Sequence, residues 1–265
     1  MTPADPTAAA HHRPPWLTLA LIGVLGGALS GAFGVGGGIL MVPLLITLGG
    51  MDQRRAAATS LVAIVPASIA GSATYLANGR GDLLVALVVA VGGVTGSYLG
   101  ARLLRRIPLT WLRWMFVTLL VVVAARMLLV APARGDEVEL GWLVGVGLVA
   151  AGLFMGVASG LFGIGGGVVL VPILIAVFGA GDLVAKGTSL LVMVPTAMMG
   201  TVTNVRGRLV DLRVGATVGL AATVASFGGV ALAFVIPTRI SGVLFALLLI
   251  FSAVQLSIRA LRSNR

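Results

Sequence analysis

The sequence contains no cysteine and very little charge. Of its 265 residues, 10% are charged and 58% are hydrophobic, and only two are histidines. The absence of cysteine excludes a disulfide framework, thiolate chemistry and cysteine metal sites. A water-soluble chain carries about 25% charged residues, because its surface must face water. Much of the surface of this protein must therefore face an apolar medium.

Apolar runs long enough to cross a bilayer recur along the whole chain, and the mean hydropathy is +1.12. A membrane-spanning helix needs about 20 apolar residues. The runs cover residues 17–49, 56–77, 83–104, 111–131, 140–178, 184–204, 212–236 and 240–258. They predict an all-α, polytopic transmembrane helical bundle of about eight segments, with membrane lipid as a partner.

The basic residues do not form a nucleic-acid surface, although the formal net charge is +10. They stand singly or in pairs between apolar runs, as at Arg54–Arg55 and Arg105–Arg106. Membrane proteins place arginine in this way, in short loops and at interfaces. We therefore expect no nucleic-acid partner.

The chain contains an internal duplication. Residues 30–50 and 159–179 align without a gap at a shift of 129 positions, and the same register continues to Pro108 and Pro237. Shared hydrophobicity explains apolar matches, but it does not explain shared Gly, Pro and Thr-Ser positions. The sequence thus predicts two homologous four-segment repeats, each with a Gly/Pro-broken helix.

The duplication defines the expected organisation of the chain. We expect a flexible N-terminal tail at 1–15, a first transmembrane repeat at 16–130, a linker at 131–139, a second repeat at 140–260 and a basic C-terminal tail at 261–265. The two histidines, His11 and His12, lie in the tail, where a solvated pair is favoured over a metal site. We expect no metal and no cofactor.

Two of the apolar runs are too long for one simple span. A helix over 17–49 would be about 50 Å long, against a hydrocarbon core of about 30 Å. This run and the run at 140–178 are interrupted by GVGGG and GIGGG, each followed by a proline. Glycine and proline are unfavourable inside helices, so we expect a break at each glycine cluster. The sequence leaves open whether the following piece crosses the membrane or re-enters.

Paired broken helices favour a substrate site. Unwound backbone at membrane depth survives only where it is buried in protein or lines a cavity, and half-helix N-termini attract anions. The alternative is that the glycines only permit close helix packing. The predicted substrate-binding residues of these two segments are Gly36, Gly37, Gly38 and Pro43, with Gly165, Gly166, Gly167 and Pro172.

Hydroxyl pairs and one lysine complete the predicted site. Thr59–Ser60 and Thr188–Ser189 could bond a ligand oxygen, or could cap or join helices. Lys186 is the only lysine, and its repeat partner is Ala57. It could extend to the headgroups, or it could be a fixed cation near an anion path.

The sequence offers nothing on which to build an enzyme. No histidine lies in an apolar run, and Asp52, Asp82, Asp182 and Asp211 stand at segment ends, where they would cap helices or carry loop charges. We predict no catalytic residues. A carboxylate or histidine relay for proton coupling is likewise not evident, whereas an anion could leave the cell down the membrane potential.

The paired SGxFGxGGGxxxxP and AxxTSL motifs resemble those of the TauE/SafE sulfite exporter family of membrane permeases. The resemblance covers roughly 17–130 and 140–260, and Gly34 and Gly163 also match its motifs. It implies a multi-pass cell-membrane permease or exporter of small anions, such as sulfite, sulfonates or sulfoacetate.

A non-transporting membrane scaffold or assembly subunit is the alternative function, and a homo-oligomer is an open arrangement for either. Eight spans would put both termini on one side, and the arginines near the C-terminus favour the cytoplasm. The same count puts Arg54, Arg55, Arg102, Arg105 and Arg106 on the opposite side, so the charges give no clear orientation.

Overall fold

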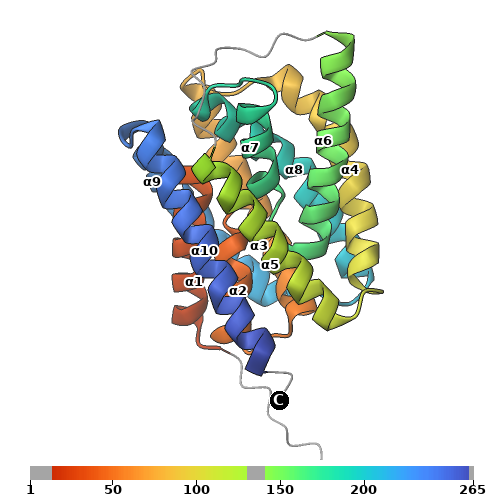
Figure 1. Ribbon diagram of the computed structural model, residues 1–265. Coiled ribbons are helices and arrows are strands. Elements are labelled where there is room, and N and C mark those ends of the chain that lie inside the picture. The colour runs from red at the N-terminus through yellow and green to blue at the C-terminus, as the bar shows by residue number, and fades with distance from the viewer. Residues whose placement is uncertain (1–13, 130–140, 263–265) are drawn as a thin grey trace, which may run out of the picture.

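The computed structural model describes residues 14–129 and 141–262, which form ten α-helices and no strand (Figure 1). The helices are α1 (Trp16–Phe33), α2 (Gly38–Thr47), α3 (Gln53–Ala77), α4 (Leu83–Leu104), α5 (Leu109–Leu129), α6 (Trp142–Phe162), α7 (Gly167–Ala176), α8 (Asp182–Arg206), α9 (Leu212–Val235) and α10 (Thr238–Arg262). The predicted linker at 131–139 and nearly all of the predicted tails, with His11 and His12, lie outside the described residues.

The predicted helix breaks are confirmed. The run at 17–49 divides into α1 and α2, and the run at 140–178 divides into α6 and α7. The bounds of α2 and α7, and those of α3 and α8, are related by the same shift of 129 that aligns the sequence. The break falls at the glycines, while Pro43 and Pro172 lie inside the short helices.

Aspartates begin several of the helices, as expected. The carboxylate of Asp52 accepts hydrogen bonds from the backbone N–H groups of Arg54 and Arg55. Asp82 and Asp211 each accept one from the third residue beyond them. These bonds satisfy amides that the helix itself leaves unpaired. Asp182 differs, because it is the first residue of α8 and pairs with a side chain.

The outer surface of the bundle is apolar. Eight helices are long and apolar enough to cross a membrane. Large hydrophobic side chains stand outward on them, including Trp16 (74% exposed), Leu220 (70%) and Val224 (74%). A soluble protein does not leave so much contiguous apolar surface in water. The prediction of a polytopic helical bundle is confirmed.

The short helices re-enter rather than cross. Gly26 on α1 lies against Gly37 and Met41, so α2 runs back along α1. Ile46, near the end of α2, borders the same pocket as Arg113 at the start of α5 and Leu256 near the end of α10. In the second repeat, Phe178 beyond α7 likewise contacts Gly147 near the start of α6. Each broken helix is therefore a hairpin that returns to its own end of the bundle.

The two hairpins enter from opposite ends. We call the end with the start of α1 and the end of α10 the first end, and the other the second end (Figure 1). Gly23, Gly27 and Gly31 of α1 lie against successive turns of α9, so these two helices run parallel. Gly152, Gly156 and Gly160 of α6 pack on α4 in the same way. Since α1 and α9 belong to different repeats, as do α4 and α6, the repeats interlock through small residues.

The re-entry corrects the expected positions of the loop arginines. Because α2 returns to the first end, the loops at 48–52 and 105–108 lie on the same side as the end of α10. Consistent with this, the guanidinium of Arg54 donates to the carbonyl of Ile107. The arginines at the first end are 54, 55, 102, 105, 106, 113, 206, 208, 213, 259 and 262, whereas 80, 126 and 239 lie at the second. The prediction of opposed charges was wrong because it counted each hairpin as one span.

Candidate functional site: two crossed glycine turns

Each hairpin turns through a short glycine segment, residues 34–37 in the first repeat and 163–166 in the second. Gly34, Gly36 and Gly37 have φ values of 68°, 75° and 69°, and the equivalent glycines have 68°, 78° and 89°. L-residues with a side chain rarely adopt this left-handed conformation. The glycine clusters are therefore required by the path of the backbone.

The two turns lie against each other at the centre of the bundle. Gly38 touches the carbonyl of Gly163, and Gly167 touches the carbonyl of Gly34. A Cβ atom at Gly38 or Gly167 would overlap the backbone of the other turn. The turns thus run antiparallel, and each short helix begins beside the end of the other repeat's long helix.

Within the part of the chain that the structure describes, the backbone donors of these turns have no partner. Among the described residues, no acceptor is found for the N–H groups of 35–39 or of 164–168, and the first bonds of α2 and α7 are donated three residues or more beyond the turn. All of these residues are buried. Buried amides are nearly always paired, so two equivalent unpaired sets need a reason.

Serines of α3 and α8 hold the turns. The hydroxyl of Ser60 donates to the carbonyl of Gly163 at 2.7 Å, and the hydroxyl of Ser189 donates to the carbonyl of Gly34 at 2.9 Å. Each serine is fully buried and each bond joins one repeat to the other. The carbonyls of Gly34 and Gly163, which follow α1 and α6, therefore have donors, in contrast to the amides beyond them.

Loss of either serine bond should weaken the fold. We expect Ser60→Ala or Ser189→Ala to lower the free energy of unfolding by about 1–3 kcal/mol, because a buried carbonyl loses its partner. Ser72→Ala is the matched control, since its hydroxyl bonds only within α3. Thermal unfolding in detergent measures the difference, and equal unfolding of Ser60→Ala and Ser72→Ala would contradict the assigned role.

The threonines of the Thr-Ser pairs join the repeats further from the turns. The hydroxyl of Thr188 accepts a hydrogen bond from the backbone of Asp82 at 2.9 Å, and Thr59 accepts one from Asp211 at 3.1 Å. Asp82 and Asp211 cap α4 and α9. The threonines therefore fix helix starts at opposite ends of the bundle.

A methionine and an isoleucine fill the space between the turns. A Cβ atom at Gly36 or at Gly165 would overlap the terminal methyl of Met193. Ile64, the repeat partner of Met193, also lies beside both glycines. Met193 and Ile64 are fully buried. The centre of the molecule is thus closed by one flexible and one branched apolar side chain.

The backbone of Lys186 lies against the first glycine turn, but its ammonium group is bound elsewhere. Its Cα and Cβ lie against Gly34, but its ammonium donates to Asp182 at 2.7 Å and to the hydroxyl of Ser241 at 2.9 Å. The side chain is 3% exposed, so it does not extend to headgroups. Because Asp182 balances the ammonium, the pair adds little net charge near the turns.

The predicted site residues thus separate into two groups. The six glycines of the clusters come together with Ser60 and Ser189 at the crossing. Pro43 and Pro172 lie more than a turn into the short helices, and Thr59, Thr188 and the Lys186 ammonium have other partners. Sequence reasoning missed Asp182, although its spacing of four from Lys186 is an ion-pair signal. It also missed Met193, for which the sequence carries no signal.

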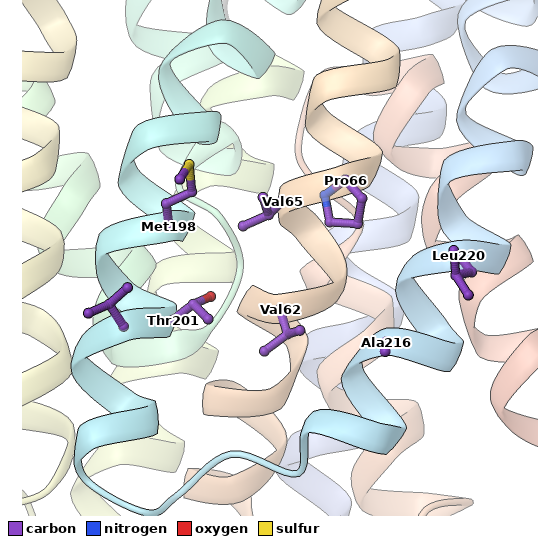
Figure 2. Close-up of a pocket in the computed structure, with 8 residues that line it drawn as sticks. Val62, Val65, Pro66, Met198, Thr201, Ala216 and Leu220 are labelled. Carbon is purple, nitrogen blue, oxygen red and sulfur yellow. The ribbon is translucent and has the colours of Figure 1, made fainter.

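A separate groove of about 470 Å³ lies between α3, α8 and α9 (Figure 2). Figure 2 shows Val62, Val65 and Pro66 facing it from α3, with Met198 and Thr201 on α8. Its walls are apolar apart from the Thr201 hydroxyl, and none of the glycine clusters borders it. A groove of this kind has no set of donors for an anion.

Comparisons with known proteins agree with this architecture. The family described as sulfite exporter TauE/SafE matches residues 2–127 and 148–265. A probable membrane transporter protein of Xylella fastidiosa (strain 9a5c) is 31% identical over 230 residues, covering 85% of each chain. The probable membrane transporter proteins YunE and YdhB of Bacillus subtilis (strain 168) are 25% and 26% identical, over 71% and 74% of this chain and 78% and 81% of their own.

Proposed function

The chain belongs to the sulfite exporter TauE/SafE family, whose curated relatives are named as membrane transporters, and from this premise we propose that it is a permease that exports a small anion through the crossed glycine turns. Sulfite, a sulfonate or a related sulfur-containing or organic anion is the proposed solute. The proposed membrane is the cell membrane.

One observation carries this proposal: two equivalent sets of buried backbone amides have no acceptor among the described residues. Each set lies at the start of a short helix, where the helix dipole adds the equivalent of about half a positive charge. Amides without side chains nearby approach an anion closely, as in other helix N-terminal anion sites. An anion between the turns would supply the missing acceptors.

The pairing of the carbonyls favours an anion over a cation. A cation at a broken helix is held by carbonyls at helix C-termini. Here the carbonyls of Gly34 and Gly163 accept hydrogen bonds from Ser189 and Ser60. These two carbonyls are therefore already engaged, whereas the amides of 35–39 and 164–168 have no acceptor among the described residues.

Passage requires the centre to open. Met193 occupies the space between Gly36 and Gly165, so a solute at the amides must displace its methyl. Methionine is unbranched and changes rotamer at low cost, whereas Ile64 is stiffer. We propose that rotation of Met193 is the local step that admits the anion.

The charges of the loops support a direction. Arginine is concentrated at the first end, which the positive-inside rule assigns to the cytoplasm. A basic cavity of about 380 Å³ lined by Arg102, Arg105 and Arg106 lies there and would concentrate anions at the inner face. Efflux of an anion from a cell with a negative interior releases about 2.3 kcal/mol per charge per 100 mV.

Voltage-driven flux tests the proposal. Proteoliposomes loaded with sulfite, thiosulfate, sulfoacetate or a small carboxylate are given an internal-negative voltage without a pH gradient. For at least one anion we expect efflux that depends on the protein. At equilibrium, the ratio of the external to the internal concentration of a monovalent anion should rise about tenfold per 60 mV. Protein-free liposomes are the control. Voltage-independent retention of every anion would contradict the proposal and favour the membrane scaffold or a coupled carrier.

A further inference from the structure

Two serine hydroxyls at equivalent positions of the repeats are buried and have no partner in residues 14–129 and 141–262. Ser30 on α1 and Ser159 on α6 are both 0% exposed, and neither hydroxyl forms a hydrogen bond within the described residues. Serine and threonine in a helix usually bond a carbonyl three or four residues earlier, as Ser72 and Thr74 do here. An unpaired buried hydroxyl is costly. Its occurrence in both repeats indicates a function rather than an accident of packing.

Helix geometry places both serines on faces of α1 and α6 that border the glycine turns. Ser30 follows Gly26 by four residues and so shares its face of α1, and Gly26 touches Gly37 in the turn. Ser159 follows Met155 by four residues, and Met155 contacts Gly166. Side chains on a helix lean toward its N-terminus, which here is the direction of these contacts. Each serine therefore lies on a helix face that borders the segment with the unpaired amides.

We propose that Ser30 and Ser159 are solute-binding residues, each forming with the free amides of its own hairpin one of two equivalent oxyanion half-sites. The inference rests on the proposed permease function and adds to it the side chains and the solute class. The serine hydroxyl donates to one oxygen of the solute while the amides of the turn donate to another. The preferred solute is thus a small oxyanion that can accept several hydrogen bonds at once.

The two half-sites face each other across Met193. The turn at 34–37 and the turn at 163–166 both contact its methyl, and each turn has its own serine. After Met193 moves, an anion that leaves one half-site meets the serine hydroxyl and the amides of the other half-site. Because the repeats are inverted, one half-site belongs to the hairpin that enters from the first end and the other to the hairpin that enters from the second.

The test compares affinity with stability in three variants. Efflux of sulfite, thiosulfate and sulfoacetate is measured from proteoliposomes containing the wild type, Ser30→Ala, Ser159→Ala or Ser252→Ala. For the transported anion we expect each of the first two to raise KM about tenfold or more, because a hydrogen bond to a charged group is lost. Ser252 on α10 is the matched control, since it is also fully buried and has no partner among the described residues. Its position in the first repeat is occupied by Val123, so it is not one of a pair.

Thermal unfolding separates a binding role from a structural one. Because the hydroxyls have no partner among the described residues, their removal should leave the unfolding midpoint unchanged or raise it. The rise in midpoint that the same anions give the wild type should shrink in Ser30→Ala and Ser159→Ala.

The outcomes distinguish the two proposals. If the wild type transports the anion and Ser30→Ala and Ser159→Ala have the same KM as the wild type, the half-sites are overturned and the permease proposal stands. A lowered unfolding midpoint with unchanged KM would likewise assign the serines to packing. If the wild type itself moves no anion and shows no shift in midpoint, the permease proposal fails with them. Ser30→Thr, which keeps the hydroxyl, should retain a KM within a few-fold of the wild type.

Discussion

Gly37→Ala should abolish folding and transport. A Cβ atom at Gly37 would overlap the carbonyl of Gly26 on the neighbouring helix, so the α1–α2 hairpin would have to open. The φ of 69° adds a conformational cost of about 1–2 kcal/mol for alanine. The opened hairpin would also lose its contact with the other turn. We expect little monodisperse protein after detergent extraction, as measured by fluorescence-detected size exclusion.

Two matched variants isolate the cause. Gly50 also has a positive φ, 65°, but nothing lies within 4 Å of its added Cβ, so Gly50→Ala should show only the conformational cost. A Cβ atom at Gly166, the repeat partner of Gly37, would overlap the side chain of Met155, which can move. The loss of folded protein in Gly166→Ala should therefore lie between the losses in Gly50→Ala and Gly37→Ala. If Gly37→Ala behaved like Gly50→Ala, the close approach of α1 and its turn would be refuted.

Asp182→Gln should be strongly destabilising, and adding Lys186→Ala should restore most of the loss. The single change leaves a buried ammonium without its carboxylate, which typically costs about 3–5 kcal/mol. The double variant removes both charges and installs the residues that the first repeat has at the equivalent positions, Gln53 and Ala57. Thermal unfolding in detergent of the wild type, Asp182→Gln, Lys186→Ala and the double variant completes a double-mutant cycle.

The same cycle separates the two roles of the lysine. A folded double variant that transports normally would show that the ammonium serves Asp182 and Ser241 and is not needed by the solute. A folded but inactive double variant would instead assign Lys186 to the anion path. Failure of the second change to recover stability would mean that the pair is not the coupled unit that the 2.7 Å contact indicates.

The sequence predicted the positions of the helix breaks but not their consequence. The glycine clusters and the shift of 129 locate both turns and the paired helix bounds. Re-entry could not be predicted, because ten apolar residues after a break suit either half of a span or a returning piece. The contact of Gly26 with Gly37 decides between them, and nothing in the repeat marks that pair.

The sequence predicted the backbone part of the candidate site, the two glycine turns, but not the partners of its side chains. The positive φ values and the helix starts follow from the glycines, whereas the partners of side chains depend on tertiary packing. Thr59 and Ser60 are neighbours in sequence, yet one bonds the start of α9 and the other bonds the turn of the second hairpin. The unpaired state of Ser30 and Ser159 is a property of the folded molecule, although their alignment in the repeats could have drawn attention to them.

The reciprocal serine bonds also constrain how the protein is made. Ser60 and Gly163 are 103 positions apart, and Ser189 and Gly34 are 155 apart. When synthesis has produced only the first repeat, the carbonyl of Gly34 and the contact surface of its turn have no partner, and lipid cannot supply one. We therefore expect the first hairpin to reach its final packing only after the second repeat has been made. Although the halves align in sequence, each supplies the serine that satisfies the turn of the other.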